Sequence, residues 1–320
     1  MTARIIMKMN VCGVRAPTDT VRVYTFSHPR RPHLPRPTPG SHVDLHLPNG
    51  QIRQYSLCGD PDDDAVYQIA VKREDQGRGA SRWIHENLRT GCTIPLSAPR
   101  NNFPLAEEDA ARHIFIAGGI GITPILPMTI HLARRGIPFE LHYCAHARRT
   151  APFLPLLNEI CGPQRLSTYF SDAGDQPASR LDVEQLLKSV TPGTHVYCCG
   201  PQRLTQAFRT VAANWPERYV HCEVFKPTLD ENFVPEPFDV KIASTGELLR
   251  IPASKSALEV LRAHGLALPS SCELGVCGAC ECRYREGTVI HRDSVLDIAA
   301  RQDRMMLCVS RARVSVTLDL

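Results

Sequence analysis

The chain has 320 residues, of which 43% are hydrophobic, and a formal net charge of +4 at pH 7. At about 150 residues per domain, this length predicts two or three domains with packed cores. The near balance of charge and the lack of a long Lys/Arg run argue against a nucleic-acid-binding protein. The first apolar stretch is too short for a signal peptide, and no stretch reaches the roughly 18 apolar residues of a membrane span. We therefore expect a cytoplasmic protein, in which 13 cysteines do not suggest a disulfide framework.

The first region, residues 1–107, alternates apolar and polar positions, as in Val21–Phe26 and His42–Leu47. Clusters of Pro, Gly, Asn and Asp separate these short runs. Alternation with a period of two between turn signals predicts an antiparallel sheet or barrel. One helix, Ala80–Leu88, is expected to interrupt the strands.

One strand of this region carries a candidate cofactor site with the sequence Arg53-Gln54-Tyr55-Ser56-Leu57. The Arg side chain offers a two-pronged donor for a phosphate, the Tyr ring can stack on a flat ring, and the Ser hydroxyl can bond a ring nitrogen. Taken alone, these residues are better explained as an ordinary half-buried strand. However, Gly77-Arg-Gly79-Ala-Ser81 precedes the expected helix, and a helix N-terminus behind glycines binds anions. Together the two motifs suggest a phosphate-bearing aromatic cofactor.

The second region, residues 108–225, alternates strands with helices and predicts an open, mainly parallel α/β domain. Its first strand runs into Gly118-Gly-Ile-Gly-Ile-Thr-Pro124, where a helix begins. Dinucleotide phosphates require such a turn, although the full glycine fingerprint is missing. A later strand ends in Cys198-Cys199-Gly200-Pro201, a second tight turn at the sheet edge where ligands bind. Cys199 can touch a nicotinamide there, but a buried thiol at a strand end explains it nearly as well.

The third region follows a proline-containing stretch, Lys226–Pro237, that is typical of a linker. Beyond it, Phe238–Ala243 alternates as a strand. Ser256 and Glu259 have the spacing of a capping box, and the helix they open is expected to end at Gly265. Residues 238–320 therefore predict a small α+β domain with a long loop that carries cysteines.

The strongest motif is the cysteine set Cys272, Cys277, Cys280 and Cys308, with the spacing C-x4-C-x2-C…C of plant-type [2Fe–2S] proteins. Three thiolates in one loop can wrap two irons, and the distant one completes the ligand set. A zinc site is a weaker alternative, because structural zinc prefers paired C-x2-C knuckles. Scattered core cysteines rarely show this spacing with glycines between them. Cys282, close by, is expected to be a strand residue and not a ligand.

These motifs together resemble the phthalate dioxygenase reductase family, the class IA oxygenase reductases that include the vanillate demethylase reductases. The resemblance covers essentially the whole chain. It implies a multidomain protein with FMN, NADH and a [2Fe–2S] cluster as cofactors, since the flavin–nucleotide–ferredoxin order implies FMN and not FAD. The implied segments are an antiparallel β-barrel FMN domain (1–107), an α/β parallel-sheet NAD domain (108–225), a linker (226–237) and a β-grasp plant-type [2Fe–2S] ferredoxin domain (238–320).

The resemblance also implies roles for individual residues. The residues expected at FMN are Arg53, Gln54, Tyr55, Ser56, Leu57, Ala70, Val71, Lys72, Gly79, Ala80 and Ser81. The residues expected at the pyridine nucleotide are Gly118, Gly119, Gly121, Thr123, Cys199, Gly200 and Pro201. Phe225 resembles the aromatic residue that covers the flavin until nicotinamide displaces it, so Ser56, Cys199 and Phe225 are the candidate catalytic residues. The sequence departs from the family pattern at Ala80, where Gly is commoner, and at Ala279, where Thr is frequent.

The implied activity is that of an NADH-dependent oxidoreductase that delivers single electrons through its cluster to a terminal oxygenase. The expected partner is a Rieske non-haem iron oxygenase, with a cytochrome P450 as the alternative acceptor. An iron–sulfur redox sensor without turnover is the alternative from another class of protein. NADH is expected over NADPH on family grounds alone, since Arg148 and Arg149, which could meet a 2′-phosphate, fit a solvated turn better. The family also implies a monomer.

Overall fold

The computed structural model of the protein describes residues 5–77, 79–106, 112–172, 174, 178–188, 190, 193–225 and 233–320. The chain divides into two compact units, Met1–Val224 and Phe225–Leu320. The predicted boundary at 107/108 and the residues 226–232 of the predicted linker lie outside the described residues. Among the helices that the structure does describe, none has the length and apolar character needed to cross a membrane.

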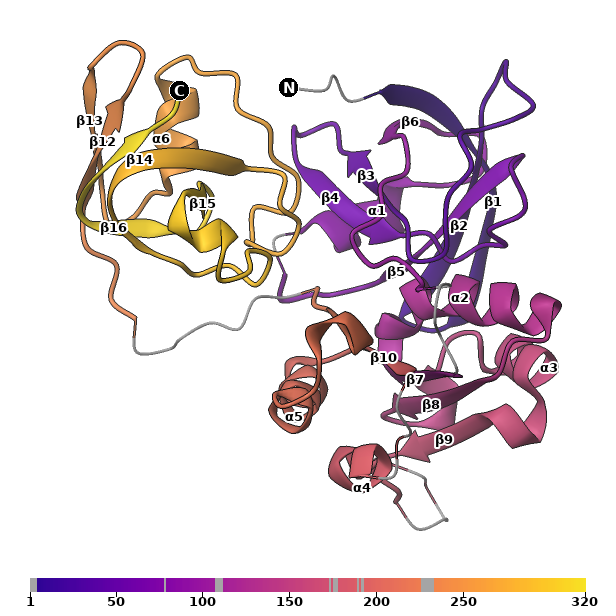
Figure 1. Ribbon diagram of the computed structural model, residues 1–320. Coiled ribbons are helices and arrows are strands. Elements are labelled where there is room, and N and C mark those ends of the chain that lie inside the picture. The colour runs from indigo at the N-terminus through magenta and orange to yellow at the C-terminus, as the bar shows by residue number, and fades with distance from the viewer. Residues whose placement is uncertain are drawn as a thin grey trace. The chain divides into compact units, whose positions relative to one another are not determined.

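The first unit begins with a six-stranded antiparallel sheet in the order β4-β3-β6-β1-β2-β5 (Figure 1). An antiparallel bridge between Leu57 and Ile69 joins the two ends of this order and closes the sheet into a barrel. Apolar side chains that alternate along the strands fill its interior, which confirms the predicted antiparallel barrel. The strands are β1 (Ile6–Thr18), β2 (Val21–Ser27), β3 (His42–His46), β4 (Ile52–Ser56), β5 (Val66–Lys72) and β6 (Thr93–Ser97).

One helix, α1 (Ala80–Asn87), packs against the barrel and agrees with the predicted helix to within one residue. Its apolar face, which includes Ile84, joins the barrel core. The side chain of His85 contacts the backbone oxygen of Val71 in β5 at 2.9 Å. The hydroxyl of Tyr24 in β2 donates to the backbone oxygen of Ile84 at 3.2 Å. These contacts hold the C-terminal half of α1 against β2 and β5.

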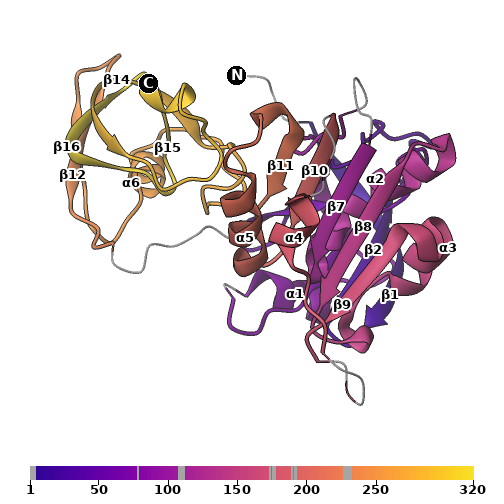
Figure 2. The same ribbon diagram turned by 60° about the horizontal axis from the view of Figure 1, so that its bottom comes forward.

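The rest of the first unit is a parallel five-stranded sheet in the order β11-β10-β7-β8-β9. Helices α4 and α5 share a core with one face (Figure 2), and right-handed crossovers place α2 and α3 on the other. The order reverses between β7 and β10, so the crevice for a ligand lies at the carboxyl ends of these two strands. The elements are β7 (Arg112–Gly118), β8 (Phe139–Ala145), β9 (Leu166–Phe170), β10 (Thr194–Cys199), β11 (Val220–Glu223), α2 (Ile122–Arg135), α3 (Leu154–Arg165), α4 (Val183–Lys188), α5 (Gln202–Ala212) and the 3-10 turns η1 (Gly119–Gly121), η2 (Arg148–Thr150) and η3 (Glu217–Tyr219).

The barrel and the parallel sheet pack together within this unit. Arg134 at the end of α2 pairs with Asp60 and Asp62 of the barrel. At Gly40 the barrel backbone approaches the connecting segment so closely that a Cβ would lie 2.0 Å from the oxygen of Phe103. The two regions predicted as separate domains are therefore one compact unit.

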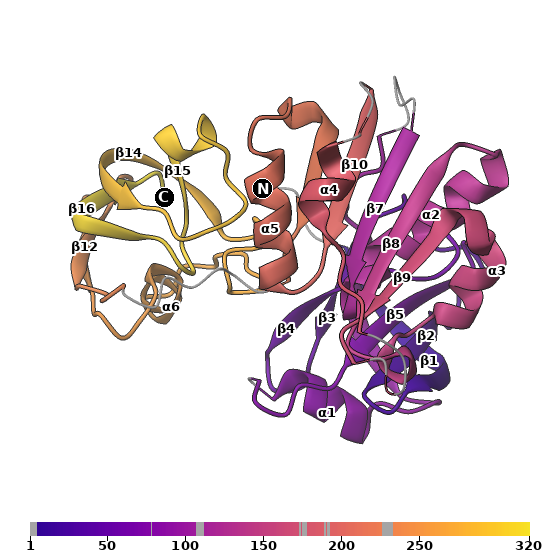
Figure 3. The same ribbon diagram turned by 90° about the horizontal axis from the view of Figure 1, so that it is seen from below.

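The second unit is a mixed five-stranded sheet in the order β13-β12-β16-β14-β15, with the helix α6 packed against it (Figure 3). Strands β12 and β16 are parallel, while the other pairs are antiparallel. Ser256 and Glu259 form the predicted capping box, with the Glu259 carboxylate accepting from the Ser256 backbone at 2.7 Å. The elements are β12 (Phe238–Ile242), β13 (Leu248–Ile251), α6 (Ala257–Ala263), β14 (Glu281–Ile290), η4 (Ala300–Gln302), β15 (Arg304–Met306) and β16 (Arg311–Leu318). This is the predicted α+β domain with a long cysteine loop.

Candidate functional site

The four predicted cluster ligands come together as two pairs of thiols. Cys272, Cys277 and Cys280 lie in the loop between α6 and β14, and Cys308 lies between β15 and β16. The side chains of Cys272 and Cys277 are within hydrogen-bonding distance of each other, and so are those of Cys280 and Cys308. A [2Fe–2S] cluster has four protein ligands, two for each iron, and the two pairs of thiols match this number.

Each pair contains one sulfur that is stabilised as a thiolate. The hydrogen bond from Cys277 lowers the pKa of Cys272 to about 6, and the bond from Cys308 lowers the pKa of Cys280. The pKa of the donating thiol is raised in both pairs, by that bond first and then by burial. Among the described residues, no three His, Cys, Asp or Glu side chains are grouped as the ligands of one metal ion would be. Four thiols in two pairs, with the plant-type spacing, fit a [2Fe–2S] cluster.

The loop around these thiols turns backbone N–H groups toward sulfur. The backbone of Leu274 donates to the Cys272 sulfur at 3.3 Å, and that of Cys272 donates to the Cys277 sulfur at 3.4 Å. Gly275 has a φ of +72°, and a Cβ there would lie 2.5 Å from Val309. Only glycine fits this turn, because it combines left-handed backbone with close packing.

Cys282 differs from the four loop and distal thiols. It lies in β14 and belongs to the hydrophobic core of the second unit. Burial raises the pKa of Cys282 to about 12. These surroundings agree with the expectation that it is a strand residue.

The candidate flavin residues are brought together where the barrel closes. The bridge between Leu57 and Ile69 sets the end of β4 beside Ala70 and Val71 of β5. Ser56 is 6% exposed. Tyr55 packs against the barrel core, and burial raises the pKa of its hydroxyl. Residues 53–57 and 70–72, which are distant in sequence, therefore lie in neighbouring segments of the barrel.

A helix N-terminus without a side-chain cap lies after the second of these strands. Gly79, at the start of α1, has a φ of +86°, and no described side chain caps that helix. The hydroxyl of Ser81 accepts from the backbone of Glu74 at 3.1 Å, so it ties down the loop that leads into the helix. Lys72 is exposed and paired with Glu74 at 3.0 Å. The uncapped backbone N–H groups, together with Arg53, fit the phosphate of a flavin mononucleotide.

Three of the candidate nucleotide glycines hold two strand ends in contact. A Cβ on Gly118 would lie 2.5 Å from Pro201, one on Gly121 would lie 2.3 Å from the oxygen of Cys199, and one on Gly200 would lie 3.0 Å from Gly118. No described atom lies within 4 Å of a Cβ placed on Gly119, whose φ is +54°. Packing between the ends of β7 and β10 therefore explains three of these glycines, while Gly119 borders open space.

The carboxyl ends of β10 and β11 place a carboxyl group beside Cys199. Cys199 is fully buried and lies opposite Glu223 in the strand register. The Glu223 Oε2 is buried without a hydrogen-bond partner among the described residues. Burial, and after it the charge of Cys222, raises the pKa of Glu223 to about 8, so this carboxyl is largely protonated at pH 7. A neutral carboxyl can donate a hydrogen bond at the site.

The remaining candidates in this region are also placed by the structure. The Thr123 hydroxyl donates to the oxygen of Ile120 at 2.9 Å and so closes the turn before α2. Phe225 lies two residues after the end of β11 and is half-buried. Sequence reasoning missed Glu223, because only the pairing of β10 with β11 brings it opposite Cys199.

We expect Glu223→Gln to stabilise the protein more at pH 9 than at pH 5. The pKa of this carboxyl is about 8 in the folded protein against an ordinary value of 4.5. The folded state thus keeps a proton that the unfolded chain releases, so stability falls as the pH rises from 4.5 through 8. Glutamine has no carboxyl group to deprotonate, so the variant does not show this fall in stability. Melting temperatures at the two pH values test this, with the exposed Glu217→Gln as the control; equal shifts in both variants would contradict it.

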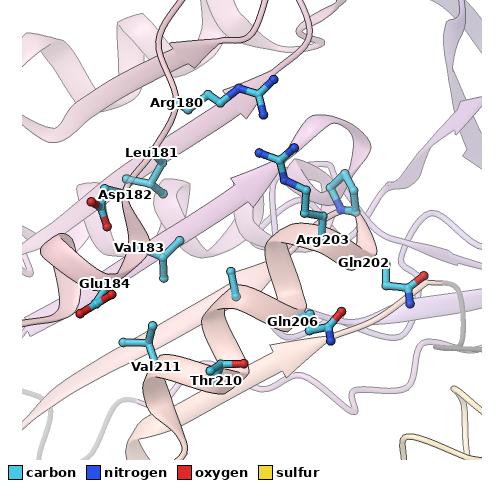
Figure 4. A pocket seen from close by; sticks show the side chains of 12 residues that line it. Arg180, Leu181, Asp182, Val183, Glu184, Gln202, Arg203, Gln206, Thr210 and Val211 are labelled. Carbon is cyan, nitrogen blue, oxygen red and sulfur yellow. The ribbon is translucent and has the colours of Figure 1, made fainter.

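A cavity of about 1110 Å³ lies beside the β10 turn, between the N-terminal part of α4 and one face of α5, and its lining includes the carboxylates of Asp182 and Glu184 (Figure 4). Pro201, one of the candidate residues, lines it, as do Arg180 and Arg203. These two arginines border the same hollow and supply positive charge suited to phosphate. Sequence reasoning missed this site, because Arg180 and Arg203 come from separate segments.

The two arginines that sequence reasoning did weigh are engaged elsewhere. Arg148 lies over the ring of Phe170 at 5.2 Å, and Arg149 pairs with Asp172 at 3.7 Å. Both contacts agree with the interpretation of this segment as a surface turn.

Comparison with known proteins gives matches along the whole chain. Residues 240–313 match the 2Fe-2S iron-sulfur cluster binding domain family. The chain is 41% identical to the phthalate 4,5-dioxygenase oxygenase reductase subunit of Pseudomonas putida, over 93% of this chain and 91% of that protein. Among solved structures, phthalate dioxygenase reductase, described as a modular structure for electron transfer from pyridine nucleotides to [2Fe–2S], matches with a TM-score of 0.77 and 34% identity over 98% of both chains. An intact type IV self-sufficient cytochrome P450 monooxygenase matches with a TM-score of 0.84 and 38% identity, over 99% of this chain and 41% of that one.

Proposed function

The chain belongs to the phthalate dioxygenase reductase family, and from this membership we propose that it is the NADH-driven reductase component of a terminal oxygenase system. The observation that carries the proposal is the two pairs of thiols, Cys272 with Cys277 and Cys280 with Cys308, in a chain that also has a flavin-type barrel and a nucleotide crevice. A redox sensor would need the thiol pairs of the cluster, but it would need neither the flavin-type barrel nor the nucleotide crevice. The reductase accounts for all of them.

Bound FMN supplies the exchange between NADH, a two-electron donor, and a [2Fe–2S] cluster, a one-electron acceptor. Arg53 and the uncapped start of α1 hold its phosphate. Tyr55 and Ser56 orient the ring system, and the closed barrel excludes water behind them. None of these side chains has to act as a general acid or base, so their contribution is orientation.

The pyridine nucleotide lies at the switch point between β7 and β10. Arg180 and Arg203 bind its phosphates in the cavity beside the β10 turn. Cys199 and the protonated carboxyl of Glu223 border the nicotinamide. Gly118, Gly121 and Gly200 keep the two strand ends close enough for these groups to act together.

A Rieske non-haem iron oxygenase is the proposed partner, and the reductase acts as a monomer. The match to a self-sufficient cytochrome P450 monooxygenase supports a P450 as the second candidate acceptor. Purified oxygenases of the two classes, each mixed with the reductase and NADH, distinguish these acceptors by the rate of oxygenase reduction.

The proposal is tested by anaerobic purification, identification of the released flavin by mass, and titration with NADH. We expect FMN to be released, and we expect NADH to bleach the visible flavin spectrum and to produce the EPR signal of a reduced [2Fe–2S] cluster. A fully loaded protein that contains zinc or lacks a flavin would overturn the proposal.

A surface close to the cluster loop is expected to contact the oxygenase. Ile298 is 85% exposed, and Val295, which is 38% exposed, packs 3.4 Å from the Cβ position of Gly278 in the cluster loop. We expect Ile298→Asp to lower electron delivery to the oxygenase about tenfold, because exposed apolar side chains often anchor interfaces. NADH-dependent reduction of ferricyanide should not change.

The matched control is Val314→Asp. Val314 is 74% exposed and lies on β16 of the same unit. The Val314→Asp substitution introduces the same negative charge as Ile298→Asp, at an exposed apolar position outside the 295–298 segment. An equal loss of electron delivery in the two variants would show that the effect is not specific to the surface near the cluster.

A further inference from the structure

Two cysteines outside the cluster face each other across neighbouring strands. Cys198 of β10 lies directly opposite Cys222 of β11 in the parallel register. Adjacent strands are about 4.8 Å apart, and disulfides join Cα atoms about 4.4–6.8 Å apart. Both side chains belong to the core under α4 and α5, together with Phe208. The register alone therefore brings these thiols within range of a disulfide.

The two thiols have different surroundings. Cys198 is fully buried, whereas Cys222 is partly exposed. The Cys198 thiol hydrogen-bonds to the Cys222 sulfur, and this bond lowers the pKa of Cys222 to about 7 against the effect of burial, with the charge of Arg209 as a further cause. The same bond, and then burial, raises the pKa of Cys198. Near neutral pH the pair thus holds a reactive thiolate next to a protonated thiol.

The pair lies on the opposite face of the sheet from the residues proposed at the nicotinamide. Side chains alternate between the two faces of a sheet, so Cys198 and Cys222 point away from the face that carries Cys199 and Glu223. The proposed electron path uses neither thiol. A reactive thiolate beside a second thiol is the arrangement of a redox-sensitive cysteine.

We propose that Cys222 is a modification site for hydroperoxides and that Cys198 is the thiol that converts the modified residue into a disulfide. In the first step the Cys222 thiolate attacks a peroxide oxygen. An S–O bond forms, the O–O bond breaks, and the peroxide leaves as hydroxide or alkoxide while the sulfur is oxidised by two electrons to a sulfenic acid. In the second step Cys198 attacks that sulfur. The S–S bond forms, the S–O bond breaks, and the hydroxyl group leaves as water with the proton of the Cys198 thiol.

The first experiment treats the holoprotein with hydrogen peroxide, quenches it with catalase, alkylates the remaining thiols and digests the protein without reduction. We expect one cross-linked peptide pair, lighter by two hydrogens than its parts, with fragmentation placing the link between Cys198 and Cys222. Dithiothreitol should reverse it. A link that instead contains Cys199, or no link at all, would overturn the proposal.

Alkylation rates give a second measurement that does not depend on any variant. Iodoacetamide should label Cys222 at pH 7 about a hundredfold faster than Cys161, a buried thiol whose pKa is raised to about 12. Equal rates for the two thiols would overturn the proposal. In Cys198→Ser, whose hydroxyl can still donate to Cys222, peroxide should leave a sulfenic acid that dimedone traps at Cys222. Absence of that adduct in a folded variant would also overturn it.

Discussion

Cys308→Ala is expected to remove the [2Fe–2S] cluster and to lower electron delivery to the oxygenase by more than about 100-fold, since even residues that only support metal ligands often cost 10–100-fold. Cys308 is the distal thiol and pairs with Cys280, so its loss leaves one iron with a single protein ligand. NADH-dependent reduction of ferricyanide should be largely retained, because this reaction does not need the cluster. Iron content, the EPR signal and the two rates provide the measurement.

Cys282→Ala is the matched control for this prediction. Cys282 is as buried as the three ligand cysteines of the loop and lies two positions after Cys280, but it belongs to the core of the second unit. Its loss should cost some stability through a small cavity and leave the cluster in place. If Cys282→Ala lost the cluster and Cys308→Ala kept it, the proposed ligand set would be wrong.

Gly121→Ala is expected to lower kcat/KM for NADH about 10- to 100-fold, because displacements near 1 Å can cost about 100-fold when they misplace reacting groups. The added Cβ would lie 2.3 Å from the Cys199 oxygen and 2.8 Å from the Gly200 nitrogen, and neither backbone atom can rotate away. The ends of β7 and β10 must then separate. Anaerobic stopped-flow reduction by NADH measures the effect, with flavin and cluster content as checks on folding.

Gly13→Ala is the control for the added methyl group. The nearest atoms to a Cβ on Gly13 are 3.6 Å away, at Thr25, which is an ordinary contact. This variant should reduce NADH oxidation little. A Gly121→Ala protein with full cofactor content and an unchanged kcat/KM would show that the close approach at Cys199 does not position the nucleotide.

Much of the fold followed from local patterns. Strand alternation predicted an antiparallel sheet or barrel, strand–helix alternation predicted the parallel sheet, and Ser256 with Glu259 predicted the start of α6. The cysteine spacing predicted the cluster loop, because three of its ligands lie within nine residues, Cys272–Cys280, and the turn between them is a property of that segment. Local sequence is sufficient to predict a motif whose interacting residues all lie within one short segment.

Long-range strand order determined the rest. Whether the sheet closes into a barrel depended on the bridge between Leu57 and Ile69. The burial of Glu223, the cavity between Arg180 and Arg203, and the opposition of Cys198 and Cys222 all depend on which strands become neighbours. Single glycines looked like nucleotide-binding residues in the sequence, yet Gly118 and Gly121 are explained by packing against the β10 turn.

The sequence by itself thus predicted a phosphate-bearing aromatic cofactor, the four cluster cysteines and the order of the regions, whereas FMN followed only from the family resemblance. Each of these depends on residue types at fixed spacing within short segments. Only the tertiary structure decided which buried groups meet, since the pKa of Glu223 and that of Cys222 depend on neighbours from other strands and helices. Such neighbours lie far apart in the chain, and their approach is set by packing of the whole unit and not by any local pattern.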